Sequence, residues 1–242
     1  MENLTTLDLI KTELEDMNRI LCGTSFEQKN TDTVSEAVNL IKTIMNKQIV
    51  EDISEGFVGN LTSYVLREHA IKYMGFALLT KKFTRSLAKY IGDKKCLEIM
   101  AGQGCLSKSL QDEGIDIIAT DNYSWSGRLN MNETWTDIED IDCLEAIIKY
   151  GKEVSYILCS WIPYQDSIGY KALKLMHEIN PDCKMIVIGE GYGGCTADDL
   201  FFEHIKTVEE NEEFMNNFKS WYHIHDYVSV VKYTDNNERE YF

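Results

Sequence analysis

The sequence predicts an α/β protein: a doubly wound, mostly parallel sheet of about seven strands, with an antiparallel hairpin at its C-terminal edge and a helical N-terminal extension. From Lys94 onward, short apolar runs alternate with helical stretches, which is typical of βαβ units. Before about Gly92, apolar residues repeat every three or four positions, as they do on amphipathic helices. We therefore expect a helical extension over residues 1–92 and an α/β domain over residues 93–242.

The composition predicts a soluble, cytoplasmic protein. The 242 residues are 44% hydrophobic, which is enough to form a substantial core. No leader segment opens the sequence, and no apolar run approaches the roughly twenty residues of a membrane helix, so no membrane partner is expected. The seven cysteines are scattered without any C-x-x-C pair, and we interpret them as reduced core residues.

A formal net charge of −16 disfavours duplex nucleic acid as a partner, because proteins that bind it usually present a basic face. The most basic segment runs from Lys81 to Lys89. Its apolar residues Phe83, Leu87 and Ile91 recur at helical spacing, so the basic residues are expected on the solvated face of a helix.

The first half of the extension contains two amphipathic stretches. Apolar residues repeat from Leu7 to Leu21 and again from Val34 to Met45, and the polar segment 22–33 separates the two stretches. The first stretch is shorter than the three to four heptads that indicate a coiled coil. We expect these apolar faces to pack against the α/β domain, with a homodimer through the N-terminal helices as the alternative.

In the α/β domain, strands are expected at 96–100, 116–120, 154–160 and 184–190, with helices after the first, third and fourth of these. Residues 135–150 should hold a brief strand and another helix. Near the C-terminus, two alternating runs adjoin around His225 and Asp226, and an antiparallel hairpin is the simplest interpretation.

The first predicted strand leads into a glycine turn, Ala101-Gly102-Gln103-Gly104, and then into a helix. Backbone can approach a ligand closely at such glycines, beside the positive end of the helix. Asp121 ends the second strand, where its carboxylate can accept hydrogen bonds from both hydroxyls of a ribose. A dinucleotide-binding turn needs a third glycine, and this chain has Ser107 there.

The order Glu98-x-x-Ala101-Gly102-x-Gly104 resembles motif I of the class I S-adenosylmethionine-dependent methyltransferases, although Met100 stands where many members have a further glycine. The resemblance spans Lys94 to about Thr234 and implies S-adenosylmethionine as the cofactor. The resemblance also implies that the turn lies under the methionine part of the cofactor, that Glu98 helps to position this methionine part and that Asp121 binds the ribose. Asp142 and Cys143 resemble the adenine-binding pair, and Asp142 is also expected to cap a helix.

The acceptor side is expected after the fourth strand, at Ser160-Trp161-Ile162-Pro163-Tyr164. This segment resembles the D/N/S-P-P-Y/F/W motif of methyltransferases that act on amino groups of bases, but Trp161 occupies the polar position and Ser160 is displaced by one. The segment "YMGFALLTKKF" loosely resembles a G-x-F-x-T-P segment over the methionine end of the cofactor in some of these enzymes.

The fifth strand ends in a glycine-rich loop, "GEGYGGCTADDL", where Glu190 is expected to orient or deprotonate the acceptor. A rigid turn that leads into a helix capped around Thr196 and Asp199 is the structural alternative. We interpret His223 and His225 as ordinary residues of one strand, and no metal site is expected.

The expected activity is methyl transfer from S-adenosylmethionine (EC 2.1.1.-) to a small molecule or a protein, with Trp161, Tyr164 and Glu190 at the acceptor. Positioning can supply much of the rate, since the donor is already activated. Three alternatives stay open: a regulatory module that binds the cofactor without turnover, an amino-methyltransferase that acts on bases, and a nicotinamide-dependent oxidoreductase.

Overall fold

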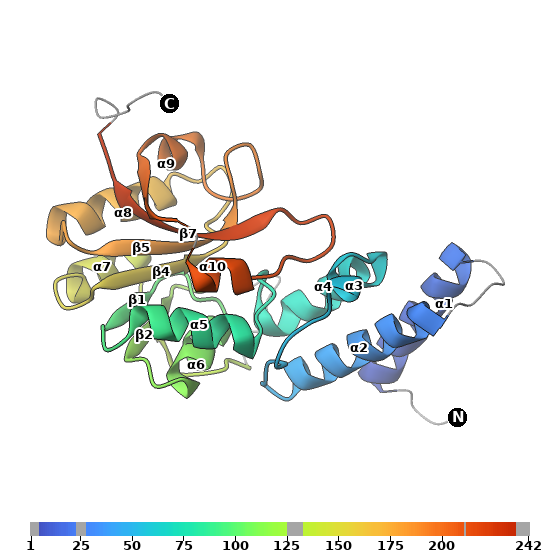
Figure 1. The fold of residues 1–242 in the computed structure, drawn as a ribbon. Coiled ribbons are helices and arrows are strands. Elements are labelled where there is room, and N and C mark those ends of the chain that lie inside the picture. Colours follow the sequence, from blue (N-terminus) through green and yellow to red (C-terminus); the bar gives the residue numbers. More distant parts are fainter. Residues whose placement is uncertain (1–4, 23–27, 125–132, 211, 236–242) are drawn as a thin grey trace.

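The computed structural model describes residues 5–22, 28–124, 133–210 and 212–235, and the side chains of residues 17–31 lie outside this description. Helices cover both faces of one seven-stranded sheet, and further helices extend from it at the N-terminal end (Figure 1). This architecture confirms the fold class predicted from the alternation of apolar runs and helical stretches.

The strand order in the sheet is β3-β2-β1-β4-β5-β7-β6. The first five strands in this order are parallel to one another, and β7 runs antiparallel to both β5 and β6. The order reverses between β1 and β4, and ligands of doubly wound sheets bind at such a reversal. The strands are β1 Cys96–Glu98, β2 Ile117–Asp121, β3 Ile138–Asp140, β4 Tyr156–Ser160, β5 Lys184–Glu190, β6 Ile205–Glu209 and β7 Asp226–Tyr233.

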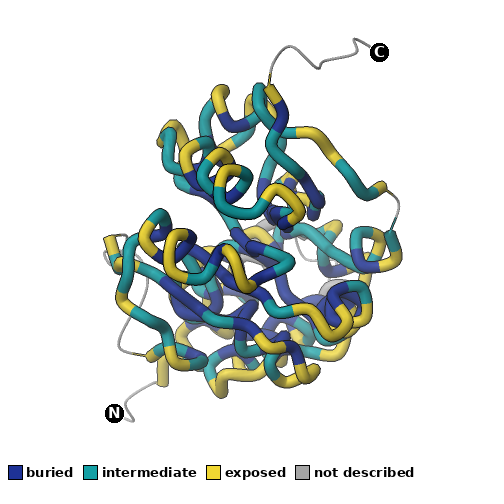
Figure 2. The backbone as a smooth tube through the Cα atoms, turned by 90° about the vertical axis from the view of Figure 1, so that its left-hand side faces the viewer, coloured by how far each residue is buried: buried dark blue, intermediate teal, exposed yellow. Residues whose placement is uncertain are grey.

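Each face of the sheet buries its own apolar cluster. Along β4, Ile157 and Cys159 belong to one cluster while Leu158 belongs to the other, because neighbouring side chains on a strand point to opposite faces. The buried stretches lie in the interior of the molecule (Figure 2). Residues of α5 Lys81–Ile91, α6 Cys105–Asp112 and α10 Glu213–Asn217 pack into one cluster, and those of α7 Cys143–Tyr150, α8 Ile168–Ile179 and α9 Asp199–Glu203 pack into the other.

The N-terminal helices share the first of these clusters. Ile10 and Leu14 of the first helix and Leu66 of the fourth are buried in the same cluster as Phe83 and Trp221. The helices are α1 Thr6–Cys22, α2 Gln28–Met45, α3 Glu55–Val58 and α4 Leu61–Met74. The apolar faces of α1 and α2 are thus buried, but they pack mainly against each other and against α4, and not against the α/β domain as expected. The division at residues 92 and 93 and the homodimer stay predictions.

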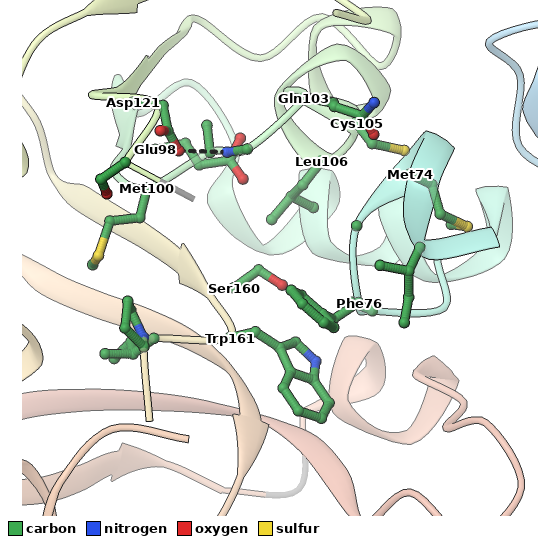
Figure 3. A pocket seen from close by; sticks show the side chains of 18 of the residues that line it. Met74, Phe76, Glu98, Met100, Gln103, Cys105, Leu106, Asp121, Ser160 and Trp161 are labelled. Atoms are coloured by element: carbon green, nitrogen blue, oxygen red, sulfur yellow. Dashed lines mark hydrogen bonds between the residues drawn. The ribbon is translucent and has the colours of Figure 1, made fainter. Parts of the chain in front are cut away.

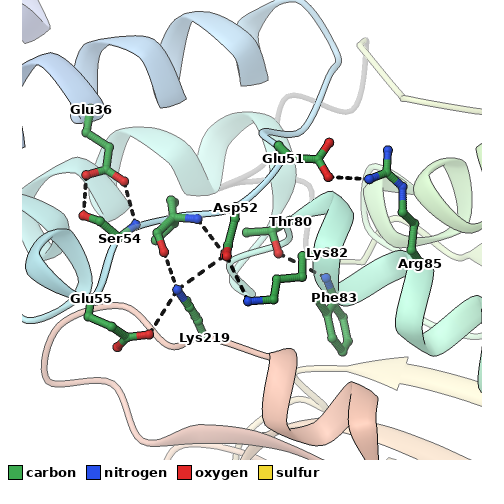
Figure 4. A network of polar contacts seen from close by, with 11 residues as sticks. Glu36, Glu51, Asp52, Ser54, Glu55, Thr80, Lys82, Phe83, Arg85 and Lys219 are labelled. Carbon is green, nitrogen blue, oxygen red and sulfur yellow. Dashed lines mark hydrogen bonds and ion pairs between the residues drawn. The ribbon is translucent and has the colours of Figure 1, made fainter.

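A polar network also joins the N-terminal segment to the sheet domain (Figure 4). Lys219, which lies shortly before β7, forms ion pairs with Asp52 at 3.4 Å and Glu55 at 3.0 Å and donates a hydrogen bond to the carbonyl of Ile53. Lys82 of α5 pairs with the same Asp52 at 3.0 Å.

Among the described residues, no helix is long and apolar enough to span a membrane.

The predicted C-terminal hairpin is wrong in one of its two strands. Strand β7 begins at Asp226, and its edge partner is β6, whereas Trp221 to Ile224 form a turn closed by a hydrogen bond from the Ile224 amide to the Trp221 carbonyl. His223 has a φ of 58° in this turn and His225 precedes β7, so neither histidine is the strand residue that we expected. The reason is the anchor at Trp221, whose indole is buried and donates to the carbonyl of Phe76 at 3.1 Å.

Candidate active site

A cavity of about 850 Å³ lies at the carboxyl ends of β1, β2 and β4, where the strand order reverses. Its volume lies within the usual range of small-molecule sites. It brings together nine of the eleven residues that the sequence predicts at the cofactor or the acceptor, and the other two are Gly104 and Glu190. In Figure 3, Glu98 and Asp121 lie toward one end of the cavity, with Trp161 and Phe76 toward the other. The nine are Glu98, Ala101, Gly102, Asp121, Asp142, Cys143, Ser160, Trp161 and Tyr164.

The glycine turn has a left-handed backbone at three positions, with φ of 54° at Met100, 58° at Gly102 and 75° at Gly104. Met100 therefore adopts a conformation that favours glycine, the residue that many class I methyltransferases have there. Gly104 does not line the cavity and caps the N-terminus of α6. A Cβ atom on Gly104 would lie 3.0 Å from Cγ2 of Thr136, so close packing behind the turn requires this glycine.

Asp121 stabilises the glycine turn from the end of β2. Its Oδ2 accepts a hydrogen bond from the amide of Gly102 at 2.8 Å, and its Oδ1 accepts one from the amide of Tyr123 at 2.7 Å. Burial raises the pKa of this carboxyl, against the effect of the two amides. Asp121 thus fixes the turn and also presents its carboxylate to the cavity.

Glu98 is fully buried beneath the turn. Its Oε2 accepts hydrogen bonds from both the amide and the hydroxyl of Ser107, and burial raises the pKa of the carboxyl to about 7. Ser107 occupies the position where a dinucleotide turn has its third glycine. The hydroxyl of Ser107 therefore connects α6 to β1 through a hydrogen bond. In a dinucleotide-binding site, a glycine at this position would instead allow close packing of the helix on the strand.

Asp142 caps α7, as expected: its Oδ1 accepts from the amide of Leu144 at 2.9 Å. Its Oδ2 accepts from the side-chain amide of Asn122 at 3.2 Å. The neighbouring Cys143 is buried, and this burial raises the pKa of its thiol to about 12, so the thiol is neutral at pH 7. Asp142 and Cys143 both line the cavity beside Asp121.

Trp161 and Tyr164 follow β4 at the other end of the cavity. Trp161 has a φ of 56°, its indole N–H donates to Oδ2 of Asp226 at 3.2 Å, and its ring stacks on Phe76 with 5.4 Å between centroids. Tyr164 is half exposed at the cavity wall. Phe76 and its neighbour Gly75, from the segment that resembles G-x-F-x-T-P, line the same cavity.

Glu190 lines a second cavity, of about 570 Å³, which shares Arg67, Trp161 and Cys195 with the first. Its carboxylate accepts from the amides of Cys195 at 2.8 Å and His225 at 3.2 Å. Glu190 therefore holds the glycine-rich loop in place, the structural alternative considered above. Its role as a base stays a prediction.

Two details of this loop differ from the sequence predictions. The N-cap of α9 is Asp198, whose carboxylate accepts from the amide of Phe201 at 3.0 Å, while the hydroxyl of Thr196 accepts from the amide of Glu190. Cys195 is exposed, in contrast to the five other cysteines whose burial is described, and it is not the core residue we expected. The side chain of Cys22 lies outside the described residues.

Sequence patterns missed the contribution of α4. Arg67, Glu68, Ile71 and Lys72 line the first cavity, and Arg67 lines the second as well. Charged residues on a helix usually belong to its solvated face, so no local signal distinguishes Arg67 from a surface residue. The only indication was the neighbouring "YMGF" segment, which ends α4 and turns into the cavity.

No protein-family model and no curated protein matches the sequence. Among solved structures, the chain is similar to a TehB-like SAM-dependent methyltransferase from Corynebacterium glutamicum, with 16% identity over 71% of this chain and 96% of the other and a TM-score of 0.45. It is similar to the CcbJ methyltransferase from Streptomyces caelestis, with 12% identity over 64% and 90% of the two chains and a TM-score of 0.41.

A third similar structure is the 1,6-didemethyltoxoflavin-N1-methyltransferase from Burkholderia thailandensis, with 14% identity over 64% of this chain and 78% of the other and a TM-score of 0.40. At identities this low, the similarity concerns the fold and says nothing about the activity of this chain. The doubly wound sheet with an antiparallel strand pair at its edge, which the resemblance to class I methyltransferases implies, is present in this chain.

Proposed function

We propose that the protein is an S-adenosylmethionine-dependent methyltransferase that acts on a small molecule or a protein. One observation carries the proposal: a single cavity at the reversal of strand order joins the glycine turn after β1, Asp121 after β2, Asp142 before α7 and the aromatic segment after β4. These four features follow one another in the order that the family resemblance implies.

The residues of the cavity fit this cofactor. Asp121 and Asp142 offer carboxylates for a ribose and an adenine amine, and Gly102 lets backbone approach the methionine part. When bound, S-adenosylmethionine supplies a methyl group that is already activated on a sulfonium. The chain then has to hold the acceptor in line and exclude water, for which the stacked rings of Phe76 and Trp161 form an apolar wall.

An acceptor amine of a nucleic-acid base is the less favoured substrate. In the motif of base amino-methyltransferases, a polar side chain holds the amine, and here Trp161 occupies that position. Its indole N–H, a donor only, is engaged by Asp226. The net charge of −16 also disfavours a polyanion.

Calorimetric titration with S-adenosylmethionine, S-adenosylhomocysteine and NAD⁺ tests the proposal. We expect both sulfur compounds to bind and NAD⁺ to give no heat. Asp121→Ala should weaken binding of both by about 1–3 kcal/mol, the usual cost of an unpaired hydrogen-bonding group. The control is Asp93→Ala, which removes an exposed carboxylate that does not line the cavity and should leave the affinity unchanged. No heat with either sulfur compound would refute the proposal.

Turnover separates an enzyme from a regulatory module. Radiolabelled S-adenosylmethionine should transfer its methyl group to an acceptor in a fractionated extract, and Trp161→Ala should abolish the transfer without abolishing cofactor binding. Cofactor binding without transfer to any fraction would favour the regulatory module. Binding of NAD⁺ alone would favour the oxidoreductase.

A further inference from the structure

We propose that the methyl acceptor carries a carboxylate beside an apolar body, and that Arg67 binds this carboxylate at the junction of the two cavities. The inference rests on the proposed function, since it names the substrate class of the same site. It concerns a residue of α4, outside every segment in which the sequence resembles a methyltransferase motif.

The two described cavities have three lining residues in common, Arg67, Trp161 and Cys195. The side chain of Arg67 is only 10% exposed. Its guanidinium carbon lies 5.4 Å from the ring centroid of Trp161 and 5.7 Å from that of Phe76. Contacts with two rings hold a guanidinium in place by cation–π attraction and leave the donors at its edges for hydrogen bonds.

The donors of Arg67 are incompletely used within the described part of the chain. Its Nη1 pairs with Glu68 at 3.2 Å, but the Glu68 side chain is 63% exposed, and exposed pairs of this kind contribute little. Its Nε is buried and has no hydrogen-bond partner in the described residues. A buried donor without a partner is costly, and a ligand carboxylate would remove that cost.

The carboxylates near Arg67 make their hydrogen bonds with other groups. Glu190 accepts from two backbone amides, and Oδ2 of Asp226 accepts from the indole of Trp161. Oδ1 of Asp226 is buried without a partner, yet no ion pair within 4.0 Å joins Asp226 to Arg67 in the described structure. Trp161 contacts both groups, with its ring against the cation and its N–H toward the anion. Burial raises the pKa of Asp226 and the charge of Arg67 acts in the opposite direction, so the two groups interact electrostatically without forming an ion pair in contact.

An arginine donates two parallel N–H hydrogen bonds to the two oxygens of a carboxylate. A neutral amide or an amine cannot accept this pair of hydrogen bonds. An acceptor bound through Arg67 would place its apolar body against Trp161 and reach from the second cavity toward Ser160. Recognition at a buried arginine also gives selectivity, because an analogue without the acid leaves the guanidinium unpaired.

The test measures binding of three naphthalene probes to the protein saturated with S-adenosylhomocysteine, by ligand-observed NMR. The probes are 2-naphthoate, the neutral 2-naphthamide and the cationic 2-naphthylmethylamine. We expect 2-naphthoate to bind at least tenfold more tightly than 2-naphthamide. Arg67→Gln should remove this preference and Arg67→Lys should reduce it, whereas Arg85→Gln, which changes an exposed arginine of α5, should keep it.

The affinity for S-adenosylhomocysteine is measured on the same variants and should not change. Three outcomes would overturn the inference: equal binding of naphthoate and naphthamide by the wild type, tighter binding of the amine, or loss of S-adenosylhomocysteine affinity in Arg67→Gln with the naphthoate preference intact. If Arg67→Gln does not fold, the wild-type comparison and Arg67→Lys still decide. If the wild type binds no S-adenosylhomocysteine, the proposed function fails, and the probes are compared on the free protein.

Discussion

Gly104→Ala tests whether the turn after β1 is held by packing from behind. Gly104 has a φ of 75°, which costs an alanine roughly 1–2 kcal/mol. The new Cβ would also lie 3.0 Å from Cγ2 of Thr136 and 3.2 Å from Cδ1 of Ile138, and overpacking of this kind costs about 1–3 kcal/mol. We therefore expect the free energy of unfolding to fall by about 2–5 kcal/mol.

The matched control is Gly114→Ala. Gly114 has a φ of 88°, but nothing lies within 4 Å of its added Cβ, so only the backbone cost of roughly 1–2 kcal/mol applies. Urea unfolding followed by circular dichroism gives both free energies by linear extrapolation. Calorimetry should show weaker S-adenosylhomocysteine binding for Gly104→Ala only. Equal destabilisation by the two substitutions would refute the packing argument.

Three further outcomes are expected. Burial raises the pKa of Glu98 in the folded protein to about 7, above its ordinary value of 4.5. Its contribution to stability is therefore complete below pH 4.5 and is lost as the pH rises through 7. Urea unfolding should show Glu98→Gln gaining stability relative to the wild type between pH 5 and pH 8; parallel profiles would contradict this. Lys219→Met should lower the free energy of unfolding by about 1 kcal/mol, because it leaves the Ile53 carbonyl without this donor. Lys89→Met, which removes an exposed pair, should leave the melting temperature unchanged. Trp161→Phe keeps a ring against Arg67 but loses the hydrogen bond to Asp226, so the KM for the acceptor should rise more than the Kd for the cofactor.

Much of the fold could be predicted from local patterns. The apolar runs at 96–100, 154–160 and 184–190 contain β1, β4 and β5, and the run at 116–120 contains β2 except for its last residue, Asp121. These runs are apolar because a buried parallel strand needs apolar residues on both faces. The meeting of the glycine turn and Asp121 at one cavity followed from the same logic. Parallel strands present their carboxyl ends at one edge, so residues after β1 and β2 had to meet there.

What depends on tertiary packing could not be predicted. The alternation before His225 suggested a strand, but burial of the Trp221 indole against the Phe76 carbonyl selects a turn instead. The position of Arg67 at both cavities gave no sequence signal, because it depends on where α4 packs against the sheet domain. The hydrogen bonds of the Glu190 carboxylate could not be predicted either. They come from the amides of Cys195 and His225, which approach Glu190 only in the folded chain.

The most direct test of the central claim is a crystal structure of the protein with S-adenosylhomocysteine. We predict that the ribose hydroxyls lie within hydrogen-bond distance of Asp121, that the adenine lies beside Asp142 and Cys143, and that the sulfur faces Ser160 and Trp161. Binding of S-adenosylhomocysteine outside this cavity, or within it with the ribose away from Asp121, would contradict the account.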